Sequence, residues 1–166
     1  IVGNPPYGAT INIESKNYLS KKYISVADFE TSQYFISNAN NLLKGFGNLG
    51  YIIPNTMLLN IMAKKFRELL IEQYSINKVI NLSEIDVFQG ATVRTVIIIC
   101  NKQFQSKENI VEFCEFEGNK VIVKNSITQE NLNVNDESWI TSLGFKNNSS
   151  FRKKIIDSTI PLKNIL

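Results

Sequence analysis

The apolar run at residues 93–101 (VRTVIIICN) constrains the fold of this chain more than any other feature. Its β-branched residues favour a strand, and its apolar side chains would lie on both faces of that strand. A strand with one face in water would instead alternate apolar and polar residues. The run therefore predicts a central strand in a covered sheet.

Two stretches carry apolar residues at helical spacing and predict helices at 27–44 and at roughly 56–73. Asn55 or Thr56 is suited to cap the second helix. Residues 8–26 are polar and lack periodicity. They predict a flexible loop, of a kind that can become ordered when a ligand binds.

The remaining periodic segments are short and predict strands. Residues 109–117 and 119–124 predict a hairpin that turns at Gly118 and Asn119. The order of strands and helices indicates an α/β sheet with helices on both faces, followed by a small hairpin and linker extension. The other strands are predicted at 1–3 (the end of a buried strand), 50–53 and 76–82.

The composition excludes several kinds of chemistry. A chain of 166 residues can form one domain with a substantial core, and a net charge of +3 is compatible with nucleic-acid binding. No histidine is present, which excludes a Ser/His/Asp triad, a histidine-ligated metal and histidine acid–base catalysis in this chain. Glu84 and Asp86 are interpreted as solvated loop residues, so no metal site is predicted.

The two cysteines, Cys100 and Cys114, lie in apolar strand-like runs and are predicted to be buried reduced thiols. No signal peptide or membrane-length apolar run occurs, so we expect a cytoplasmic protein with no membrane partner. The first residue is not methionine, and we interpret the chain as a piece of a longer protein.

The segment Gly-Asn-Pro-Pro-Tyr at 3–7 is suited to hold a planar amino or amide group. The Asn4 side-chain oxygen can accept a hydrogen bond, and Pro5, which has no N–H, offers its carbonyl. Pro5 and Pro6 stiffen the loop, and Tyr7 supplies a ring face for stacking. This arrangement suits the N6 amino group of an adenine that has left its base stack. An ordinary turn is the alternative.

The position of this segment agrees with ligand binding. Ligands of open α/β sheets bind beyond the carboxyl ends of the strands. Residues 4–7 lie at one such end, and the loop after residue 82 lies at another. Phe88 belongs to that second loop, where we expect it to be partly exposed rather than part of the core.

From residue 1 to about 103, the order of motifs resembles the catalytic domain of DNA adenine-N6 methyltransferases. The resemblance is strongest to γ-class enzymes of restriction–modification systems, including fused type IIG restriction enzymes. Besides residues 1–7, it depends on stretches at 34–35 (YF), 42–44 (LLK), 47–55 (GNLGYIIPN), 65–70 (KFRELL), 87–90 (VFQG) and 93–95 (VRT).

The resemblance implies roles for the motif residues. Asn4, through its side chain, and Pro5, through its carbonyl, would accept both hydrogens of the target amino group. The nitrogen lone pair would then be free to attack the methyl group of S-adenosylmethionine. Pro6 completes the catalytic motif. Tyr7 would stack on the flipped adenine, and Phe88 would pack against the other side of that base.

The resemblance also implies a cofactor site that this chain holds only in part. Phe35 would line the adenine of S-adenosylmethionine, with Asn4 also near the cofactor. The family's glycine-rich cofactor loop and its ribose-binding acidic residue precede the Asn-Pro-Pro-Tyr motif and are absent from this sequence. We therefore predict poor cofactor binding and no turnover for the isolated chain.

The resemblance also predicts how the chain is divided into domains. Residues 1–103 would be the C-terminal half of a catalytic domain, and residues 104–166 a hairpin and connection toward a target-recognition domain. Double-stranded DNA would be the partner of the full-length protein. A partial sheet exposes an edge strand and apolar surface, so the isolated chain is predicted to self-associate.

Two alternatives remain open from the sequence. Protein-glutamine and RNA-adenine methyltransferases also use an Asn-Pro-Pro-Tyr motif, so the substrate could be a protein or an RNA. A non-catalytic scaffold or interaction domain is the other possibility, because half of the cofactor site is missing from the chain.

Overall fold

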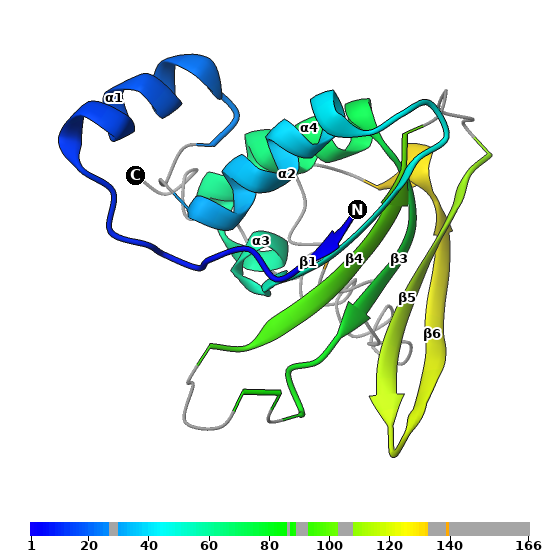
Figure 1. Ribbon diagram of the computed structural model, residues 1–166. Helices are drawn as coiled ribbons and strands as arrows, with labels where there is room; N and C mark the ends of the chain where they lie inside the picture. The colour runs from blue at the N-terminus through cyan, green and yellow to red at the C-terminus, as the bar shows by residue number, and fades with distance from the viewer. Residues whose placement is uncertain (27–29, 86, 89–92, 103–107, 133–138, 140–166) are drawn as a thin grey trace, which may run out of the picture.

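The computed structural model describes residues 1–26, 30–85, 87–88, 93–102, 108–132 and 139. Within these residues, a mixed six-stranded sheet forms in the order β1-β2-β4-β3-β5-β6 (Figure 1). Strands β1, β2, β3 and β5 run in one direction, and β4 and β6 run in the other. The strands are β1 Val2–Gly3, β2 Asn48–Pro54, β3 Ser75–Asn81, β4 Thr95–Asn101, β5 Ile110–Glu117 and β6 Lys120–Thr128.

The central strand predicted at 93–101 is confirmed as β4, which pairs with β2 on one side and β3 on the other. Val96, Ile98 and Cys100 are fully buried on the face of the sheet that the helices cover. Ile97 and Ile99 are half-buried on the opposite face. Helices were expected on both faces, but among the described residues they pack against one face only.

Helices α2 (Thr31–Leu42) and α4 (Lys64–Gln73) lie side by side over that face (Figure 1). Ile36 and Ala39 of α2, and Phe66 and Leu70 of α4, are buried against β2 and β3. The helical spacing of apolar residues in the sequence arises from this burial, because only one side of each helix contacts the sheet.

The helix predicted at 56–73 is broken. Helix α3 (Thr56–Leu59) is followed by the short 3-10 helix η1 (Ile61–Ala63) and then by α4. Asn60 separates the first two with an extended ψ of 124°. The buried Arg67 side chain donates to the carbonyls of Met57 (2.8 Å) and Asn60 (2.9 Å). These bonds satisfy carbonyls that a continuous helix would have paired internally.

The loop predicted at 8–26 is wrong in its central part, where ten residues form helix α1 (Ile13–Lys22). Asn12 caps this helix by accepting a hydrogen bond from the backbone of Ser15 (2.8 Å). Glu14 in its first turn and the lysines in its last turn interact favourably with the helix dipole. None of its residues is buried, so its sequence needed no apolar periodicity.

The first strand is also more exposed than predicted. β1 forms an edge of the sheet and pairs only with β2 among the described strands (Figure 1). The side chain of Val2 is 90% exposed, and that of Ile1 is 44% exposed. The expectation of a buried strand at 1–3 is therefore wrong for the chain as it stands.

The hairpin predicted around Gly118 and Asn119 is confirmed as β5 and β6. Gly118 has a φ of 60°, which glycine adopts without the steric cost that other residues meet. β5 pairs in parallel with β3, so the hairpin extends the same sheet. Leu132 and Trp139 are buried in the main core. The boundary at 103/104 remains a prediction.

Both cysteines are free and buried, as predicted. Burial raises the pKa of the Cys100 thiol from 9.0 to about 12. Because the folded state keeps its proton where the unfolded state has lost it, folding stability should fall as the pH rises above 9. We expect the free energy of unfolding to fall by about 1.4 kcal/mol between pH 7 and pH 10, because pH 10 lies one unit above the ordinary thiol pKa. Urea denaturation at pH 7 to 10 tests this, and Cys100→Ala should remove this part of the pH dependence.

Candidate functional site

The carboxyl ends of β1, β2 and β3 meet at one edge of the sheet, because these strands run in the same direction. Residues 4–7 follow β1, Asn55 follows β2, and the loop that carries Phe88 follows β3. This edge brings together segments that are more than 80 residues apart in the sequence, such as Asn4 and Phe88. The predicted position of the site at strand ends agrees with this arrangement.

Asn4 and Tyr7 are in direct contact. The Tyr7 hydroxyl donates a hydrogen bond to Asn4 Oδ1 (2.5 Å) and lies 3.1 Å from the carbonyl oxygen of Ile52 in β2. Partial burial, with the nearby Glu30 carboxylate, raises the pKa of Tyr7, which keeps the hydroxyl protonated and able to donate. Asn4 is exposed. Its oxygen has a second lone pair, which leaves room for a further donor from solvent or a ligand.

The start of α2 holds the loop from the other side. Thr31 Oγ1 donates to the Pro6 carbonyl (2.6 Å) and accepts from the backbone of Ala9 (3.2 Å). Glu30 accepts a hydrogen bond from the backbone of Gly8 (3.2 Å). Pro5 is buried, and its carbonyl accepts no hydrogen bond from the described residues. Sequence reasoning missed both anchors, because an acidic residue just before a helix and a threonine at its first position look like ordinary capping residues.

Phe88 lies beside Tyr7, with ring centroids 6.5 Å apart and ring planes at 69°. This edge-to-face contact fills the space between the rings. A planar base in contact with both faces would need parallel rings about 7 Å apart, at roughly 3.5 Å for each carbon contact. One of the rings must therefore turn before a base can lie between them. The neighbouring Asp86 and residues 89–92 lie outside the described residues.

Phe35 lies on α2, one turn beyond Thr31, and is 48% exposed. It lines a mainly apolar hollow of about 390 Å³ between α1 and α2, together with Leu19, Tyr23 and Tyr34. Asn4, Tyr7 and Phe88 do not line this hollow. Its predicted contact with a cofactor adenine remains a prediction.

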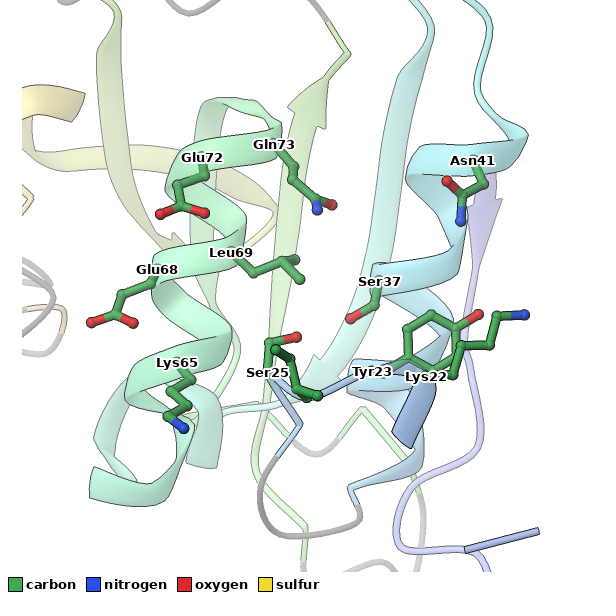
Figure 2. A pocket seen from close by; sticks show the side chains of 11 residues that line it. Lys22, Tyr23, Ser25, Ser37, Asn41, Lys65, Glu68, Leu69, Glu72 and Gln73 are labelled. Carbon is green, nitrogen blue, oxygen red and sulfur yellow. The ribbon is translucent and has the colours of Figure 1, made fainter. Parts of the chain in front are cut away.

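A second hollow, of about 550 Å³, lies between α2 and α4 and the segment that follows α1. Figure 2 shows Lys65, Glu68 and Glu72 on α4 across from Ser37 and Asn41 on α2. None of the residues predicted for the site lines this hollow. Because both lysine and glutamate side chains reach it, its charge favours no single class of ligand.

Metal and membrane signals are absent from the described part of the chain. No group of three or more His, Cys, Asp or Glu side chains there could hold a metal ion. No helix within the described ranges is long and apolar enough to cross a membrane.

Solved structures with a similar fold over part of their length include subunits of restriction–modification enzymes. A modification subunit of a putative type I restriction enzyme from Vibrio vulnificus matches 96% of this chain and 31% of its own, with a TM-score of 0.56 and 14% identity. A type I restriction-modification methyltransferase subunit from Streptococcus thermophilus matches 74% of this chain and 28% of its own, with a TM-score of 0.53 and 21% identity.

The chain belongs to the Eco57I restriction-modification methylase family, whose model matches residues 1–88. The type II restriction enzyme and methyltransferase RM.Eco57I of Escherichia coli is 29% identical over 154 residues, covering 84% of this chain. A putative enzyme of the same kind from Methanocaldococcus jannaschii is 33% identical over 111 residues, or 67% of this chain. The chain spans only 15% and 9% of the length of these relatives.

Proposed function

We propose that this chain is part of a DNA methyltransferase that transfers a methyl group to the N6 amino group of an adenine flipped out of duplex DNA, within a restriction–modification system. The observation that supports it most is that Tyr7 contacts both Asn4 and Phe88 at the carboxyl ends of β1 and β3. Membership of the Eco57I family supports a methyltransferase, and the amide and carbonyl acceptors support an amino group as the target.

The chain's own residues would act by holding the base. Asn4 Oδ1 and the Pro5 carbonyl would each accept one hydrogen of the amino group, which directs the nitrogen lone pair away from them. The Tyr7 ring and the Phe88 ring would hold the base from opposite faces. S-adenosylmethionine, when bound, would supply an electrophilic methyl group. One amino proton would leave to solvent after transfer, so no strong base is needed.

The described residues fit the base better than they fit the cofactor. The hollow beside Phe35 offers apolar surface, but in the described residues no glycine-rich turn joins a strand to a helix to hold the rest of S-adenosylmethionine. We therefore propose that the cofactor site is completed by residues of a longer polypeptide. This proposal agrees with the small share of the relatives' length that the chain spans.

The proposed reaction is tested by incubating the full-length protein with S-adenosylmethionine and duplex DNA, and measuring N6-methyladenine by mass spectrometry. We expect methylation of duplex DNA and none of RNA or of a protein that carries glutamine targets. Methylation of RNA or protein alone would contradict the DNA assignment. Absence of transfer to all three substrates would favour a non-catalytic scaffold.

The division of the cofactor site is tested by calorimetric titration of S-adenosylmethionine into the isolated 166-residue chain and into the same protein extended toward its N-terminus. We expect binding only to the extended form, because the isolated chain lacks the cofactor loop. Equal affinity for both forms would show that the described residues hold the cofactor without that loop.

We also propose that the full-length protein acts in the cytoplasm, where its cofactor and DNA are found. Separately, we propose that the isolated chain self-associates. The exposed β1 edge and an apolar hollow of about 490 Å³ beside it, lined by Val2, Ile52, Ile97 and Ile99, support self-association. Light scattering tests this, and we expect the mean mass to rise with concentration. A single monomer mass at high concentration would contradict it.

A further inference from the structure

Three residues form a closed hydrogen-bonded ring at the base of the loop that carries Phe88. Asn55 Nδ2 donates to Ser83 Oγ (2.9 Å), and the Asn55 backbone N–H donates to the Arg94 carbonyl (2.9 Å). The Arg94 guanidinium completes the ring by donating to the Ser83 carbonyl. Ser83 begins the loop, and Arg94 stands at its return into β4. Both ends of the loop are therefore attached to Asn55.

Ser83 is held in one orientation within this ring. Its hydroxyl donates to Asn81 Oδ1 (2.6 Å), and its backbone N–H donates to the same oxygen (3.1 Å). A hydroxyl has one proton and two lone pairs. Because the proton is used on Asn81, the oxygen can only accept from Asn55. The bonds therefore run in a fixed direction, from Asn55 to Ser83 to Asn81.

The side chain of Asn55 does not serve its own helix. Asn55 occupies the N-cap position of α3, where an asparagine oxygen usually accepts a hydrogen bond from the first turn. It makes no such capping bond. Its amide instead reaches the loop after β3, 28 residues away in the sequence. A role confined to helix α3 would not explain this contact.

The segments that carry both aromatic residues of the candidate site are anchored at β2. The Tyr7 hydroxyl lies 3.1 Å from the Ile52 carbonyl within β2, and the loop of Phe88 is attached to Asn55, which follows β2. The rings meet at 6.5 Å. The end of β2 is therefore a common anchor for Tyr7 and for the loop that carries Phe88.

We propose that Asn55 is a positioning residue that acts through Ser83 to hold the Phe88 loop opposite Tyr7, so that a target base can lie between the two rings once one of them has turned. This inference depends on the proposed function, since the position of Phe88 matters only if a base enters the site. Asn55 acts through Ser83 rather than on the base itself.

The test uses the full-length protein and two measurements. The first is the fluorescence of a duplex with 2-aminopurine in place of the target adenine, which rises when the base leaves the stack. The second is the single-turnover methylation rate on the ordinary duplex. Asn55→Ala and Ser83→Ala should each lower the rise in 2-aminopurine fluorescence and the methylation rate by about fivefold to tenfold, as expected for one lost hydrogen bond. Affinity for the duplex should be unchanged. Ser83→Thr keeps the hydroxyl and should behave as the wild type.

The decisive comparison repeats Asn55→Ala in a Phe88→Ala background. With no ring to position, the further change in rate should be less than about twofold. A further loss of about fivefold or more there would overturn the proposal, as would wild-type behaviour of Ser83→Ala. If Asn55→Ala does not fold, which thermal unfolding would show, Ser83→Ala and Ser83→Thr make the same comparison in that background.

Failure of the proposed function gives a different result. If Phe88→Ala leaves both the fluorescence and the methylation rate of the wild type unchanged, then the base does not lie against this ring. In that case the assigned site is wrong, whatever Asn55 does. If Phe88→Ala lowers both and Asn55→Ala lowers neither, only the positioning role is overturned.

Discussion

Replacing Asn4 with alanine is expected to reduce methylation by the full-length protein by at least about 100-fold, the loss seen when one preorganised hydrogen-bonding group is removed at a reacting atom. In the proposed site, Asn4 Oδ1 is the side-chain acceptor for the target amino group, and alanine cannot replace it. The fold should change little, because Asn4 is exposed and, within the described residues, its side chain bonds only to the Tyr7 hydroxyl. Single-turnover kinetics and circular dichroism measure the two effects.

Asn41→Ala is a matched control for this experiment. Asn41 is also an exposed asparagine, but it lies on α2 beside the hollow of Figure 2, away from the carboxyl ends of the strands. It should keep the wild-type rate. Retained activity in Asn4→Ala, or an equal loss in Asn41→Ala, would contradict the role assigned to Asn4.

Replacing Gln129 with methionine is expected to have the largest effect on stability. Gln129 is 4% exposed, and its amide makes four hydrogen bonds. Its Oε1 accepts from the backbone of Ile76 (2.8 Å) and from Asn109 (2.8 Å). Its Nε2 donates to the carbonyls of Ile71 (3.0 Å) and Tyr74 (2.7 Å). The end of α4, strand β3 and the start of β5 are therefore joined through one side chain.

Methionine fills nearly the same volume but cannot make these bonds, so the buried backbone groups lose the partner that Gln129 provides. We expect the free energy of unfolding to fall by about 3 kcal/mol, since each unsatisfied buried group costs roughly 1–3 kcal/mol and the costs are not additive. The melting temperature of the chain should fall by roughly 6–12 °C. The exposed neighbour Asn131, changed to alanine, is the control. A shift no larger than that of Asn131→Ala would show that the four bonds contribute little.

The sequence predicts the parts of this fold where burial leaves a pattern. The centre of the sheet follows from residues 93–101, because apolar side chains are required on both sides of β4 there. The hairpin follows from Gly118, since its backbone conformation favours glycine. Tyr7 and Phe88 both follow carboxyl ends of strands that run in the same direction, and such ends meet at one edge of the sheet. Ligands of open α/β sheets bind at that edge, which is why the sequence could predict that the two residues lie close together.

Other parts leave no such pattern. Helix α1 buries none of its residues, so only the cap at Asn12 and the charges at its ends could have indicated it. The break at Asn60 depends on Arg67, whose guanidinium satisfies carbonyls that lie in the preceding turns. The ring formed by Asn55, Ser83 and Arg94 joins three separate segments, and no local rule relates asparagine, serine and arginine at those spacings.

The parallel pairing of β3 with β5 has a consequence for any domain attached beyond the hairpin. The same strand that leads into the Phe88 loop carries, along its other side, the ladder that holds β5 and β6. If a domain is joined rigidly to the end of β6, the sheet would therefore determine its orientation, whereas a flexible linker would leave that orientation free. Its reading of a DNA sequence and the presentation of one base to Asn4 would then be aligned by the same framework of hydrogen bonds.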